Sequence, residues 1–94
     1  MKYDYVFEWF TNGITIMIVS PKRIQERIAT AYDIHLHWIT SEELPESIRD
    51  RFLELEGKIS SNKPLIEMNT ETAGEIADDI FEIYLAFLPY YYKS

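Results

Sequence analysis

Residues 69–88 read NTETAGEIADDIFEIYLAFL, and this stretch decides the fold because it contains the clearest helical pattern in the chain. Its apolar residues recur at intervals of three and four, which is the spacing of one face of an α-helix. The central stripe consists of Ile76, Ile80, Ile83 and Phe87. Asn69 is a suitable N-cap, and Pro89 is expected to end the helix, since residues before proline avoid helical geometry. We therefore predict a core helix over 69–88.

The same stretch carries a dense group of carboxylates on its remaining face. These residues are Glu71, Glu75, Asp78, Asp79 and Glu82. One interpretation is an ordinary solvated helix face, which is the common role of surface charge. The other is an interaction site, in which the acidic edge meets a basic surface on a partner protein.

Two further helices are predicted upstream. Ser20 and Pro21 suit a helix entry, so the first should cover 20–39. His35 lies on its apolar face and should be buried, whereas His37 points to the polar side, so a shared metal is not expected. Pro45 suits the first turn of a second helix over 45–59. The apolar stripe of that helix contains Ile48, Phe52, Leu55 and Ile59.

The N-terminal segment 2–19 has the pattern of a β-hairpin. Aromatic and β-branched residues flank Asn12-Gly13, a dipeptide typical of a two-residue type I′ turn. Pairing about that turn would place Trp9 opposite Ile16 and Phe7 opposite Ile18, which gives one apolar face. Residues 1–16 could instead form an extension outside the helical core.

We therefore expect residues 1–94 to form a single domain that is mainly α. The predicted architecture is a compact three-helix bundle with an N-terminal β-hairpin, which would become α+β if the hairpin paired across a dimer. A chain of 94 residues with 47% hydrophobic content is long and apolar enough for one modest core.

The composition of the chain limits the cellular compartments and the classes of binding partner that we expect. The chain has no cysteine, no secretory leader pattern and no apolar run long enough to span a bilayer, so we expect a cytoplasmic protein that binds no membrane. The net charge is −7, and residues 41–94 carry all of it, with 12 acidic and 5 basic groups. Because an acidic surface repels phosphate, direct nucleic-acid binding is disfavoured.

The spacing of some carboxylates resembles a known metal-binding pattern. Glu42-Glu43-x-x-Glu46 is followed by Glu75-x-x-Asp78, and this order resembles the motif of MazG-type all-α nucleoside-triphosphate pyrophosphohydrolases. The resemblance implies that these five carboxylates hold Mg²⁺ on the phosphates of a nucleotide. Pro45 interrupts the first motif, where that family has continuous helix.

Other catalytic classes find no support in the sequence. No Gly-x-Ser-x-Gly, cysteine nucleophile or phosphate-binding loop occurs. Lys22, Arg23 and Arg27 form a small basic cluster, which we expect to face the acids of helix 69–88.

Aromatic residues gather at both ends of the chain. They include Trp9, Phe10, Tyr90, Tyr91 and Tyr92. If the two ends meet, these rings would form one aromatic surface, and tyrosine and tryptophan are enriched at interaction hot spots. Alternatively, some of the rings fill the small core.

The sequence therefore favours a non-catalytic protein–protein interaction module, such as a regulator, inhibitor or adaptor, without a metal or other cofactor. We expect a homodimer through the hairpin edges and terminal aromatics, and a protein partner with a basic surface. The alternatives are a Mg²⁺-dependent pyrophosphohydrolase and an acidic inhibitor of a nucleic-acid-binding protein.

Overall fold

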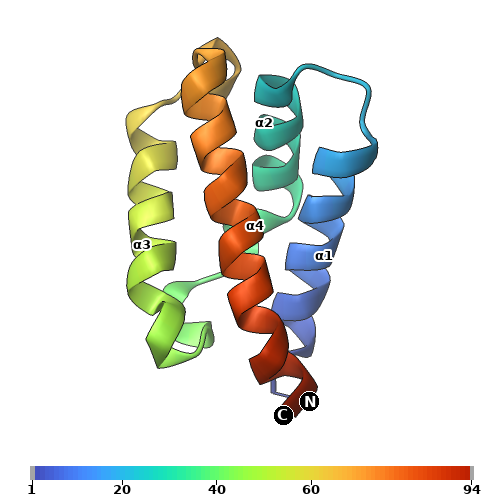
Figure 1. Ribbon diagram of the computed structural model, residues 1–94, viewed down its shortest axis with the longest axis vertical. Coiled ribbons are helices and arrows are strands. Elements are labelled where there is room, and N and C mark those ends of the chain that lie inside the picture. The colour runs from blue at the N-terminus through green and yellow to red at the C-terminus, as the bar shows by residue number, and fades with distance from the viewer. Residues whose placement is uncertain (1, 94) are drawn as a thin grey trace.

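The computed structural model describes residues 2–93, and this range contains four α-helices joined by short connections (Figure 1). The helices are α1 (Asp4–Val19), α2 (Ile24–Ile34), α3 (Glu46–Ser61) and α4 (Thr70–Lys93). Single 3-10 turns occur at η1 (Leu36–Trp38), η2 (Ser41–Glu43) and η3 (Leu65–Glu67). Successive helices run in opposite directions, so the start of α1 and the end of α4 lie at the same end of the bundle. No helix within 2–93 combines the length and apolarity needed to cross a bilayer.

The predicted N-terminal hairpin is wrong, and the bundle has four helices rather than three. Residues 4–19 form α1, and no strand occurs among residues 2–93. The buried positions of α1 follow the helical period and not the alternation of a strand. They are Val6, Phe10, Gly13, Ile14 and Met17. The segment is therefore part of the core rather than an extension, and the expected α+β alternative falls with the hairpin.

Gly13 shows why a dipeptide typical of turns lies inside a helix. A Cβ atom at this position would lie 2.8 Å from Leu36 Cδ2 of η1, so the missing side chain permits close approach of the two segments. Glycine costs a helix about 1 kcal/mol relative to alanine. Burying even one large apolar side chain of α1 contributes about 1.5–3 kcal/mol, so packing outweighs the local preference.

In α4 the predicted apolar stripe and the predicted N-cap are confirmed, but the helix does not end where we predicted. Ile76, Ile80, Ile83 and Phe87 are all buried. The Asn69 Oδ1 atom accepts a hydrogen bond of 2.7 Å from the backbone N–H of Thr72. The helix continues through Pro89 to Lys93, although proline provides no N–H for the bond to the preceding turn. Aromatic contacts beyond Pro89 hold this last turn against α1.

The two middle helices differ from expectation mainly at their ends. In α3 the predicted stripe of Ile48, Phe52, Leu55 and Ile59 is buried, as expected. The predicted helix 20–39 begins later, at Ile24, and breaks at His35 before η1. His35 is half-buried at this break rather than buried on a helix face, whereas Leu36 and Ile39 enter the core.

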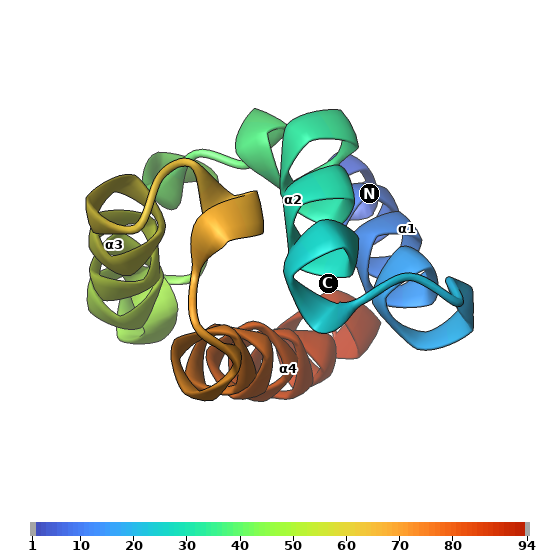
Figure 2. The same ribbon diagram turned by 90° about the horizontal axis from the view of Figure 1, so that it is seen from above.

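Helix α4 packs against α1, α2 and α3 and organises the bundle (Figures 1 and 2). On the side away from α4, η3 lies between α2 and α3 and packs against α2, as the golden segment in Figure 2 shows. The buried Gln25 of α2 fixes this region, because its Nε2 atom donates to the Met68 carbonyl at 3.0 Å and to Thr70 Oγ1 at 3.3 Å. These two hydrogen bonds of Gln25 join α2 to the start of α4.

Two glycine substitutions test the close approach of α1 to η1. Gly13→Ala should destabilise the protein relative to Gly57→Ala by at least about 1 kcal/mol, because overpacking a buried site costs about 1–3 kcal/mol. Gly57 is exposed in α3 with no atom within 4 Å of an added Cβ, so its substitution should stabilise by up to about 1 kcal/mol. Urea denaturation monitored by circular dichroism measures both. Equal stability of the two variants would contradict the packing of Gly13 against Leu36.

Candidate interaction surface

One row of side chains on α4 faces solvent along nearly the whole helix. Its members are separated alternately by four and three residues, and such spacing places side chains along one line of a helix. All of them are exposed. We call them the outer row of α4: Glu71, Glu75, Asp78, Glu82, Leu85, Pro89 and Tyr92.

The outer row is divided into two halves of different chemistry. Its first four residues are acidic, and its last three are apolar or aromatic. Leu85 exposes 61% of its surface and Tyr92 exposes 72%, so both present large apolar groups to water. Isolated exposed apolar residues are common on proteins, but here they continue a line of carboxylates on a single rigid helix.

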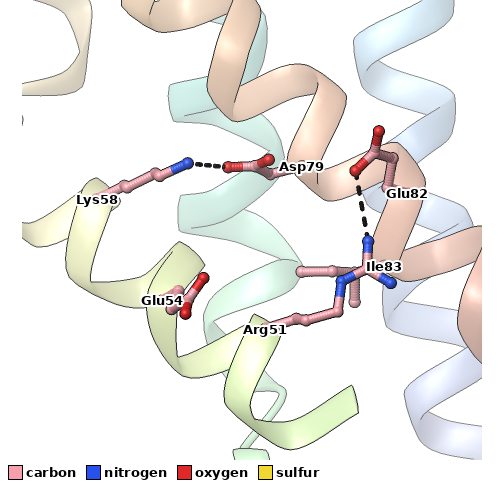
Figure 3. A pocket seen from close by; sticks show the side chains of 6 residues that line it. All are labelled: Arg51, Glu54, Lys58, Asp79, Glu82 and Ile83. Atoms are coloured by element: carbon pink, nitrogen blue, oxygen red, sulfur yellow. Dashed lines mark hydrogen bonds and ion pairs between the residues drawn. The ribbon is translucent and has the colours of Figure 1, made fainter. Parts of the chain in front are cut away.

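Cations of α3 pair with one carboxylate beside the outer row and with one carboxylate in it (Figure 3). The Lys58 Nζ atom lies 2.6 Å from Asp79 Oδ2, and the Arg51 Nη2 atom lies 3.4 Å from Glu82 Oε2. Among the described residues, the carboxylates of Glu71, Glu75 and Asp78 have no ion pair. The acidic half of the outer row therefore keeps most of its negative charge available to a partner.

A shallow polar groove of about 230 Å³ lies between α3 and α4 at these ion pairs (Figure 3). Its lining residues are Arg51, Glu54, Lys58, Asp79, Glu82 and Ile83. The groove carries two positive and three negative side chains, so its formal charge is 2 − 3 = −1. Both of its cations are already paired, and the groove thus offers a partner acidic rather than basic groups.

The basic cluster of the second helix does not face the acids of α4. Arg23, which precedes α2, pairs through its Nε atom with Glu26 Oε1 in the first turn of that helix at 3.1 Å. Arg27 Nη1 donates to the Met17 carbonyl at 2.8 Å and so satisfies one of the last carbonyls of α1. Lys22 is exposed and its backbone N–H donates to Ser20 Oγ. The expected pairing is therefore made by α3 instead.

The two chain ends do bring aromatic rings together. Phe7 of α1 stacks on Tyr91 of α4 with ring centroids 4.1 Å apart, and Tyr92 approaches Phe7 edge-on at 6.4 Å. Burial raises the pKa of the Tyr91 hydroxyl, and the negative charge of Asp4 raises it further. Most of this aromatic contact joins α1 to α4 and leaves Tyr92 exposed at the edge.

The other aromatic candidates serve different purposes. Phe10 exposes only 1% of its surface and belongs to the core, so a partner cannot reach it. Trp9 is half-buried and stacks on the exposed Tyr5 with centroids 6.0 Å apart. Tyr90 Oη lies 2.6 Å from Ser47 Oγ and ties the end of α4 to the start of α3.

The five carboxylates of the alternative metal site are not brought together. Glu42 and Glu43 lie in η2, where Glu43 Oε1 accepts from the Thr40 N–H at 3.1 Å. Glu46 begins α3, next to the contact that Ser47 makes with Tyr90.

Tyr90 follows Glu75 by 15 residues on the same helix. At about 1.5 Å per residue this corresponds to roughly 22 Å. Within residues 2–93 no group of three or more histidine, aspartate or glutamate side chains is placed to hold a metal ion. The carboxylates from the two halves of the motif therefore cannot share one Mg²⁺.

Comparison with protein-family models, with curated proteins and with solved structures found no match for this chain.

The acids of α4 are recognisable in the sequence, but two other aspects of this surface are not apparent from the sequence alone. The alternating spacing of Leu85, Pro89 and Tyr92 with the acids is readable in the sequence once the helix is known to pass Pro89. The pairing of Lys58 with Asp79 leaves no local signal, because it joins residues of different helices.

The Lys58–Asp79 pair should contribute to stability in a pH-dependent way. The hydrogen bond to Asp79 and its charge raise the pKa of Lys58 above the ordinary value of 10.5. The contribution is therefore fully present below pH 10.5 and is lost as the pH rises through the raised pKa. Melting temperatures across pH 8–12 should show the difference between wild type and Asp79→Asn shrinking at the alkaline end.

Glu82→Gln is the matched control for this experiment. Its partner Arg51 stays protonated across the whole range, so the corresponding difference should remain flat. A difference for Asp79→Asn that is independent of pH would contradict the pairing with Lys58.

Proposed function

We propose that this protein is a small, non-catalytic protein-interaction module that binds a helical segment of another protein along the outer row of α4. The division of that row into an acidic half and an apolar half is the observation that supports this proposal. The row belongs to a helix that packs against α1, α2 and α3, so its side chains are presented without a folding cost on binding.

The chemistry of the outer row defines the partner. A helix that lies beside α4 would need basic residues opposite Glu71–Glu82 and apolar residues opposite Leu85–Tyr92. Opposite charges would set the register and accelerate encounter, and burial of Leu85 and Tyr92 would provide affinity. Recognition of an amphipathic helix by another surface is a common mode of protein–peptide binding.

A second copy of the chain fits this row poorly. Antiparallel pairing of two α4 helices would place the carboxylates of one copy against Leu85 and Tyr92 of the other, and parallel pairing would oppose acids to acids. The predicted dimer through hairpin edges also has no basis, because residues 4–19 are helical. A dimer through exposed aromatics such as Tyr5 remains a prediction, which mass measurement in solution can test.

The apolar half of the row argues against the alternative of an acidic inhibitor of a nucleic-acid-binding protein. An inhibitor that occupies a nucleic-acid-binding site would be expected to present negative charge over its full contact surface. Leu85, Pro89 and Tyr92 instead interrupt the charge, and they suit contact with the apolar side of a protein helix.

A panel of 21-residue helical peptides tests the proposal. Two divided peptides carry lysines in one half and leucines in the other, one in each sequence order. A uniformly basic peptide and a scrambled peptide serve as controls. We expect one of the divided peptides to bind the full chain with micromolar affinity that weakens as salt rises, as measured by fluorescence anisotropy. Absence of binding by both divided peptides, or equal binding of the scrambled one, would contradict the proposal.

Charge-reversal variants locate the site. Glu75→Lys with Asp78→Lys should weaken peptide binding by about tenfold or more, which is about 1.4 kcal/mol. Asp50→Lys with Glu67→Lys changes the net charge equally, and both of these exposed residues lie outside α4. Equal losses in the two double variants would show that only the overall charge matters and would refute the outer row as the site.

A further inference from the structure

A second surface, separate from the outer row of α4, is an apolar groove on α2. It has a volume of about 350 Å³ and is formed by one face of α2 and by residues 63–66, which enter η3 and begin it. Its lining residues are Ala29, Asp33, Lys63, Pro64, Leu65 and Ile66. This volume falls within the range of small-molecule sites, which are mostly apolar with a few placed polar groups.

The two charged residues that line this groove come from different segments of the chain. Asp33 belongs to α2, and Lys63 precedes η3. They form no ion pair with each other, and Asp33 has no hydrogen-bond or ion-pair partner among the described residues. The Lys63 ammonium lies 5.5 Å from the ring centroid of Tyr32, which is a weak contact that leaves its three N–H donors uncommitted.

Burial of Leu65 and two hydrogen bonds hold the wall of the groove that contains η3. Leu65 is 5% exposed and anchors one wall in the bundle. The Ile66 carbonyl accepts a hydrogen bond of 3.3 Å from Arg23 Nη2, and the Met68 carbonyl accepts one of 3.0 Å from the buried Gln25. Ile66 nevertheless exposes 48% of its surface beside the groove, where a ligand could cover it.

The negative charge of Asp33 also reaches the residue that precedes it in α2. Burial raises the pKa of the neighbouring Tyr32 hydroxyl, and the negative charges of Glu56 and Asp33 raise it further.

We propose that this groove binds a small zwitterion with an apolar side chain, the chemistry of an aliphatic amino acid. The ligand ammonium would meet the Asp33 carboxylate, and the ligand carboxylate would meet the Lys63 ammonium. The apolar side chain would lie on Ala29, Leu65 and Ile66 and exclude water from them. A ligand with one charge only would leave either Asp33 or Lys63 unmatched.

Three probes of nearly equal shape separate these contributions. Leucine carries both charges, 3-methylbutylamine lacks the carboxylate, and 4-methylpentanoate lacks the ammonium. Leucine should bind the full chain with a dissociation constant on the order of 1 mM, since so small a ligand gains limited contact. Each truncated probe should bind at least fivefold more weakly. Chemical-shift changes in ¹H–¹⁵N spectra should centre on Ala29, Asp33 and Ile66.

Single substitutions test which residue meets which charge of the ligand. Asp33→Asn should remove the advantage of leucine over 4-methylpentanoate, and Lys63→Met should remove its advantage over 3-methylbutylamine. Both positions are exposed, so the fold should persist, and Glu67→Gln serves as a nearby control outside the groove. Equal affinity of the three probes for the wild type, absence of binding at 20 mM leucine, or shifts centred elsewhere would overturn the proposal.

Discussion

The arrangement of the helices depends on the contacts that the buried ring of Phe10 makes with the rings of Phe87 and Phe52. Its centroid lies 5.6 Å from that of Phe87 in α4 and 6.4 Å from that of Phe52 in α3, so one side chain of α1 meets two other helices. Phe10 and Phe87 are each no more than 1% exposed. In a strand, Val6, Phe10 and Ile14 would share one face, but Gly13 and Met17 would point to the opposite face. In the helix all five are buried together. The shared core therefore requires α1 to be helical.

This constraint explains why the N-terminal pattern was misleading. Residues 4–19 satisfy two periods at once, because their apolar residues are so numerous that both an alternating and a helical face can be drawn. Asn12-Gly13 favoured the turn locally. The glycine serves instead as the place where Leu36 approaches the helix, a relation between residues 23 positions apart that no local pattern reveals.

The surface features follow from the same packing. Because α1 covers one flank of α4 and α3 covers the other, one narrow line of α4 remains in water, and that line is the outer row. The cations of α3 pair with Asp79 beside this line and with Glu82 in it. Arg23, which precedes α2, and Arg27 of α2 instead pair with Glu26 and with backbone carbonyls of other segments. The groove on α2 likewise exists because η3 is inserted between α2 and α3, where Leu65 anchors it.

The sequence by itself determined the helical character of α2, α3 and α4, the stripes that α3 and α4 bury, the cap at Asn69 and the acidic composition of α4. These features are local, since each depends on residues within a few helical turns. The tertiary structure decided the state of residues 4–19, the continuation of α4 past Pro89, the partners of Arg27 and Lys58, and the separation of Glu46 from Glu75. Each of these depends on which helix lies beside which, and the free energy of burying apolar surface settles that arrangement over the whole chain.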